Sequence, residues 1–186
     1  AKVKHHKAMS WKDVPAFYAD LKNRKAMAAK ALMFTCLTGS RTSEVLGVRW
    51  EEIDFDARLW TCPAERMKSG EIHRVPLTDE MLTIIAPLRA MDSDYVFEGQ
   101  KRNKPLSNMS MLMLLRRMEV EGVTVHGFRS TFRDWAGEVA NVPREVAEMS
   151  LANVERAYAR SDLLDKRRVL MGHWSLFVSG NGDKNV

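Results

Sequence analysis

One stretch of the sequence breaks an otherwise helical hydrophobic pattern, and it limits the folds that the chain can adopt. Residues 53–62, IDFDARLWTC, alternate apolar and polar side chains on either side of positions 56–57, which predicts a β-hairpin. A third run, IHRVPL at 72–77, follows a turn at 68–71. We therefore expect a small three-stranded antiparallel sheet on a mainly helical body, which is an α+β fold.

The rest of the chain shows apolar residues at helical spacing. Asp13 and Pro15 open the first helix and Gly39 ends the second, because proline suits a first helical turn and glycine a C-terminal cap. A short helix restarts at Thr42 or Ser43. Further helices are expected over 79–88, 108–118, 126–140 and 163–177, with shorter ones after Pro143 and Val154.

Length and composition are those of one folded domain. The chain has 186 residues, of which 45% are hydrophobic, so it can bury a full core and is not disordered along most of its length. We expect a polar, basic linker at 1–10, one folded domain at 11–178 and a frayed tail at 179–186. The net charge of +5 suits a polyanionic partner.

Several function classes lack their sequence signals. The chain contains no phosphate-binding loop, dinucleotide fingerprint, serine-hydrolase elbow or metal-ligand spacing, so we expect no metal or other cofactor. Cys36 and Cys62 lie among apolar neighbours, which predicts buried thiols in a reducing compartment. No signal peptide opens the sequence, and no apolar run reaches the roughly 18 residues of a membrane span. A cytoplasmic protein is expected.

Basic residues at the edges of the predicted elements are the candidates for chemistry. His126 and Arg129 are three residues apart on a predicted helix and can point at one spot, with Arg133 one turn further along. The same spacing also fits a helix-capping histidine and an arginine in an ion pair. Arg41 precedes a predicted helix start, which suits an anion, although a surface ion pair with Glu44 explains it too.

Two further residues are ambiguous by themselves. Lys68 lies at the tip of a predicted turn, where solvated lysines are common. Tyr158 lies in the segment VERAYARSD, where an amphipathic core tyrosine is equally consistent with the pattern.

Four sequence blocks, taken together and in this order, show a family resemblance that no single residue shows. They are LTGSRTSEVLGVRWEEIDF, MKSGEIHRVPL, HGFRSTFRDWA and ERAYARSDLLDKRRVLM. Together they closely resemble the tyrosine recombinase family, in particular integrases of phages, prophages and genomic islands similar to that of phage P4. The resemblance spans residues 11–174, nearly the whole chain.

The resemblance implies the fold of a tyrosine recombinase catalytic domain and a site-specific recombinase that integrates DNA through a 3′-phosphotyrosine intermediate. It implies double-stranded DNA attachment sites as partner, a tetramer on that DNA, and action at the bacterial nucleoid, with neither a membrane nor a small-molecule substrate. The implied site consists of two phosphate-gripping arginines, a lysine in the turn before the third strand, a histidine, the nucleophile and a supporting acid: Arg41, Arg129, Lys68, His126, Tyr158 and Glu44.

One position departs from the family pattern. The family usually has a His or Trp after a Leu-Ala pair, whereas Asn153 follows Leu151-Ala152 here, only five residues before Tyr158. The spacing predicts that a short loop of the family is missing between Leu151 and Val154. The departure supports one alternative function, a DNA-binding regulatory module without catalysis. A type IB topoisomerase activity is the other alternative, because it resembles the family in its chemistry.

Overall fold

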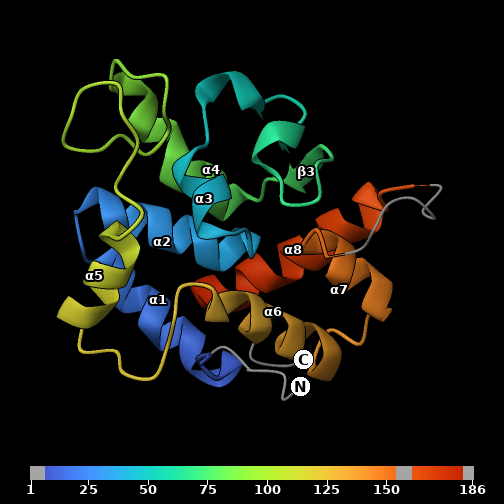
Figure 1. Cartoon of the computed structure of the whole chain (residues 1–186). Coiled ribbons are helices and arrows are strands. Elements are labelled where there is room, and N and C mark those ends of the chain that lie inside the picture. The colour runs from blue at the N-terminus through green and yellow to red at the C-terminus, as the bar shows by residue number, and fades with distance from the viewer. Residues whose placement is uncertain (1–6, 154–160, 182–186) are drawn as a thin grey trace.

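A central helix organises the fold. The structure is a computed structural model that describes residues 7–153 and 161–181 (Figure 1). Helix α2 (Met27–Thr38) packs against α1, α3, α4, α5, α6 and α8, and ten of its twelve residues are buried. A helix that is apolar on all sides is stable only inside a core, which explains why α2 is surrounded.

The other described elements are arranged around α2 (Figure 1). In chain order they are η1 (Trp11–Asp13), α1 (Val14–Lys22), α3 (Thr42–Leu46), η2 (Trp50–Glu52), β1 (Ile53–Asp54), β2 (Leu59–Cys62), η3 (Ala64–Arg66), β3 (His73–Pro76), α4 (Asp79–Ile85), η4 (Ala86–Ala90), α5 (Ser110–Arg117), α6 (Gly127–Glu138), α7 (Arg144–Ser150) and α8 (Leu164–Ser179).

The predicted three-stranded sheet is confirmed. Its order is β1-β2-β3, both pairs are antiparallel, and Trp60 of β2 lies opposite Ile53 and Val75. Trp60 and Val75 are buried, so one face of the sheet joins the core. The strands are shorter than predicted because the chain turns at residues 55–58, where Arg58 adopts a φ of 53°.

The predicted helices agree with the structure apart from details at their ends. The helix predicted over 79–88 divides into α4 and the 3-10 helix η4, which contains Pro87, because proline cannot donate the backbone hydrogen bond of an α-helix. Three 3-10 helices, η1, η2 and η3, were not predicted. The helix predicted after Val154 lies outside the described residues, as do most residues of the predicted linker and tail.

The predicted burial of both cysteines is confirmed, since Cys36 and Cys62 are buried free thiols, and burial raises the pKa of each. Within the described ranges, no helix is long and apolar enough to cross a membrane.

An aromatic cluster docks α8 onto the body of the protein. The ring of Trp174 lies 5.0 Å from that of Trp135 and 5.6 Å from that of Phe132, both on α6. Its indole nitrogen donates a 2.9 Å hydrogen bond to the carbonyl of Cys36 on α2. Trp174 thereby joins three helices, and the orientation of α8 depends on it.

This docking predicts a large effect of one truncation. Trp174→Ala is expected to lower the free energy of unfolding by about 3–5 kcal/mol, because it leaves a cavity and an unpaired carbonyl. Leu176→Ala is the control on the same helix; Leu176 is 48% exposed, and its truncation is expected to cost about 0.5 kcal/mol or less. Urea denaturation followed by circular dichroism measures both. Similar losses in the two variants would contradict the proposed docking.

Candidate functional site

A buried arginine lies where two helices end. Arg129 is on α6, and it is 5% exposed. Its guanidinium donates to the carbonyls of Gly39 and Leu151, at 2.6 Å each, and to Oδ1 of Asn153 at 2.8 Å. Gly39 caps the C-terminus of α2 and Leu151 that of α7, so both carbonyls belong to helix ends that carry partial negative charge. The plane of the guanidinium is therefore fixed by the fold.

Gly39 is required for this arrangement. Its φ is 63°, and a Cβ at this position would lie 2.7 Å from Cδ2 of Leu151. Only glycine accepts both the left-handed conformation and the close approach. The turn at Gly39 presents its carbonyl to Arg129 and leads the chain into Arg41 two residues later.

Arg41 lies beside Arg129 and is aimed by a buried acid. Glu44 is 2% exposed, and its carboxylate accepts hydrogen bonds from Nη1 of Arg41 at 2.8 Å and from the Arg41 backbone at 2.9 Å. Nη2 of Arg41 lies 3.5 Å from Oδ1 of Asn153, the atom that Arg129 also contacts. The ion pair between Arg41 and Glu44 that the sequence suggested is thus present, and it directs the guanidinium of Arg41 toward Arg129.

The two cations lie in an environment that favours an anion. Burial, and next the charge of Arg41, lowers the pKa of Arg129 to about 10, while Glu44 acts in the opposite direction. Arg129 is still charged at neutral pH. A bound anion would relieve the repulsion between the guanidiniums and replace lost solvation.

Glu148 organises the other side of the site. Its Oε2 accepts hydrogen bonds from Nη2 of Arg133 at 3.3 Å and from Nδ2 of Asn153 at 3.0 Å. Its Oε1 lies 2.9 Å from Nε of Arg133 and 3.7 Å from Nε of Arg144 in ion pairs. Arg133, which was expected to extend the basic face, is therefore paired with an acid. Sequence reasoning missed Glu148 and treated Asn153 only as a departure from a pattern, although the amide bridges Glu148 and Arg129.

Three predicted site residues remain, namely His126, Lys68 and Tyr158. His126 is exposed at the start of α6, and its carbonyl accepts from the backbone of Arg129. Lys68 is exposed in the turn before β3, which is closed by a 3.0 Å hydrogen bond from Gly70 to Met67. Tyr158 lies outside the described residues. The predicted loss of a loop after Leu151 involves Val154, which is also outside them, and stays a prediction.

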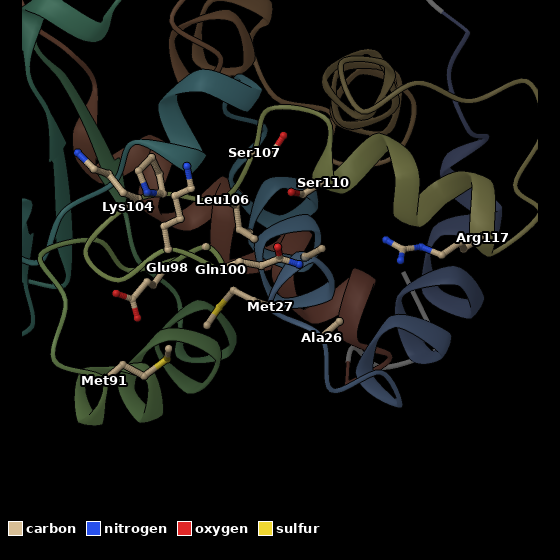
Figure 2. Close-up of a pocket in the computed structure, with 14 residues that line it drawn as sticks. Ala26, Met27, Met91, Glu98, Gln100, Lys104, Leu106, Ser107, Ser110 and Arg117 are labelled. Atoms are coloured by element: carbon tan, nitrogen blue, oxygen red, sulfur yellow. The ribbon is translucent and has the colours of Figure 1, made fainter.

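A separate hollow of about 680 Å³ lies between the loop at 98–107 and the starts of α2 and α5 (Figure 2). Met27, Met91 and Leu106 contribute apolar surface, and Lys104 and Arg117 add positive charge. None of the predicted site residues that the structure describes lines it. The described residues also contain no group of three His, Cys, Asp or Glu side chains that could hold a metal ion.

Residues 7–150 match the family described as the Phage integrase family. Prophage integrase IntA of Escherichia coli (strain K12) is 36% identical over an alignment of length 163 that covers 82% of this chain and 39% of that protein. The integrase of Enterobacteria phage P4 is 30% identical over an alignment of length 211, gaps included, that covers 100% of this chain and 48% of the relative. The chain therefore spans less than half the length of these relatives.

Solved structures share the fold at low sequence identity. A lambda integrase (75-356) dimer bound to a COC' core site has a TM-score of 0.62 at 15% identity, covering 87% of this chain and 60% of that chain. XerA recombinase has a TM-score of 0.61 at 14% identity, covering 89% and 60%. The mostly helical architecture with its small antiparallel sheet is thus that of tyrosine recombinase catalytic domains.

The paired arginines predict that a simple anion stabilises the protein. Inorganic phosphate at about ten times its Kd is expected to add about 1.4 kcal/mol, or roughly 3–6 °C in Tm. Arg41→Gln is expected to reduce the shift, because it removes one of the two cations. Arg102→Gln, at an exposed ion pair elsewhere, is the control and should keep it. Differential scanning fluorimetry at matched ionic strength measures the shifts; equal shifts in all three proteins would contradict the site.

Proposed function

Because the chain belongs to the phage integrase family, we propose that it is the catalytic domain of a site-specific DNA recombinase that cleaves and rejoins DNA through a 3′-phosphotyrosine intermediate. The observation that carries the proposal is the pairing of Arg41 and Arg129 at one point, one aimed by a buried carboxylate and the other by helix-end carbonyls. Such a site holds charged donors in place before the substrate arrives.

The arginine pair suits the transition state of phosphoryl transfer. Attack on a phosphodiester places growing negative charge on the non-bridging oxygens, and fixed donors there are each worth about 3–4 kcal/mol. A guanidinium has five N–H donors, and the three hydrogen bonds of Arg129 to the protein use three of them. Arg129 can therefore be held by the protein and still donate to a phosphate oxygen.

The proposed reaction exchanges one phosphoester for another. The hydroxyl oxygen of Tyr158 attacks the phosphorus, a P–O bond to the tyrosine forms, and the P–O5′ bond breaks. A tyrosine hydroxyl has a pKa of about 10, so it needs nearby cations or a base, and we assign His126 to this proton transfer. Lys68 on its exposed turn supplies the proton that the 5′ oxygen takes up. The role of Tyr158 rests on the match of its sequence block.

Rejoining reverses these steps with a 5′-hydroxyl as nucleophile. When that hydroxyl belongs to a partner duplex, the product is recombinant DNA; when it is the original end, the duplex is resealed and relaxed. We propose double-stranded attachment-site DNA as partner and a tetramer as the active assembly, with the nucleoid of a bacterial cytoplasm as its place. A lambda integrase tetramer bound to a Holliday junction, which shares the fold, supports this assembly.

One observation favours a second candidate, a DNA-binding regulatory module without catalysis. Oδ1 of Asn153 accepts from Arg129 and lies near Arg41, so an amide oxygen occupies space between the cations where a phosphate oxygen would bind. A module of this kind would bind DNA but would not form a covalent bond to it.

A covalent trap separates the two functions. A labelled pool of nicked duplexes with a randomised central sequence is incubated with the protein in EDTA, and adducts are resolved on a denaturing gel. The wild-type chain is expected to shift label into the protein band. Tyr158→Phe should abolish the shift while keeping DNA affinity within about twofold. A persistent adduct in the Phe variant would refute the assignment of Tyr158, and no adduct from the wild type would favour the binding module.

A further inference from the structure

We call residues 154–161, which contain Tyr158, the tyrosine block, and the aspartate that follows this block is bound by an arginine of the sheet. Nε and Nη2 of Arg74, on β3, donate to the two carboxylate oxygens of Asp162, at 2.7 Å each. Two parallel hydrogen bonds between opposite charges form one of the stronger and more directional contacts in proteins. The side chain of Asp162 is 14% exposed, so its carboxylate is largely shielded from solvent, whereas the side chain of Arg74 is 41% exposed.

A second arginine also contacts Asp162. Arg167, on α8, is 1% exposed; its Nη1 donates to the backbone carbonyl of Asp162 at 3.4 Å and lies 3.8 Å from the carboxylate. Its Nη2 donates to the carbonyl of Arg74. We call Arg74, Asp162 and Arg167 the Asp162 clamp. It joins β3 to the start of α8, which lie side by side (Figure 1).

The Asp162 clamp is close in sequence to the proposed nucleophile, Tyr158. Asp162 follows Tyr158 by four residues, and an extended chain advances at most about 3.6 Å per residue, so the two Cα atoms are within about 14 Å. The turn with Lys68 needs no such support, because β3 is already paired with β2 along its length. The clamp therefore fixes where the tyrosine block ends and is not needed to hold the lysine turn.

We propose that Asp162 is a positioning residue that fixes the exit of the tyrosine block, so that Tyr158 meets the phosphate held by Arg41 and Arg129. The proposal rests on the proposed function. A misplacement of about 1 Å in a reacting group costs roughly a hundredfold in rate. Loosening the clamp should therefore slow the chemical step without changing how DNA binds.

Two substitutions test this role, one that removes a positive charge and one that removes a negative charge. Arg74→Gln removes the forked pair but leaves Asp162 and Arg167 together, and Asp162→Asn removes the carboxylate charge. Both are expected to slow single-turnover adduct formation at saturating DNA by about ten- to a hundredfold. An electrostatic role in DNA binding would instead weaken affinity in Arg74→Gln and strengthen it in Asp162→Asn, with saturated rates unchanged, and that result would overturn the proposal.

A sulfur leaving group shows which reacting group is misplaced. In a duplex selected from the pool and made with sulfur at the 5′-bridging position, the leaving thiol has a pKa of about 8.5 and needs no proton donor. Lys68→Ala should recover on this substrate, whereas the two clamp variants should stay slow. Recovery of the clamp variants would overturn the proposal, because the clamp would then act on Lys68.

The controls distinguish a loss of positioning from a loss of folding and from a failure of the proposed function. Arg102→Gln breaks an exposed ion pair with Asp92 and should keep the wild-type rate on both substrates. Circular dichroism and Tm check that each variant folds, and Arg74→Gln decides the outcome if Asp162→Asn does not fold. Wild-type cleavage with unchanged clamp variants refutes the positioning role alone; no wild-type adduct refutes the proposed function and the positioning role with it.

Discussion

The burial of one guanidinium is the constraint on which the site depends. A charge taken out of water is costly unless protein groups replace its lost hydrogen bonds, and the carbonyls of Gly39 and Leu151 and the amide oxygen of Asn153 do so for three N–H donors of Arg129. Those acceptors require α2 and α7 to end at the same place, and they require a glycine where α2 ends. The central helix, its cap and the position of α7 all follow from holding this group.

Two anchors flank the residues that the structure does not describe between 153 and 161. On the α7 side, Asn153 is bound to Glu148 and to Arg129. On the α8 side, Asp162 is bound to Arg74 in the sheet. The residue before this segment, Asn153, thus lies at the arginine site, and Asp162, which follows the segment, is bound to the sheet that carries the Lys68 turn.

Local patterns predicted the elements, while long-range contacts could not be predicted from them. The alternation of apolar and polar residues predicted the sheet, and Gly39 predicted the end of α2, because each signal lies within a few residues. The roles of Arg41 and Arg129 were inferred from the four sequence blocks, and the structure places the two side chains beside each other. The role of Glu148 and the Asp162 clamp had no such signal, since each joins residues distant in sequence, and a backbone acceptor such as Leu151 has no sequence signature at all. The roles of Lys68, His126 and Tyr158 stay predictions.

The central claim is that Arg129 acts on the phosphate in the transition state, beyond any contribution to binding. Arg129→Lys keeps the charge but loses the fork, and the direct measurement compares its DNA affinity with its single-turnover rate of adduct formation. The account predicts a rate about a hundred- to a thousandfold lower, with Kd changed by less than about threefold. Equal losses in affinity and rate would contradict it, because Arg129 would then serve only to bind DNA.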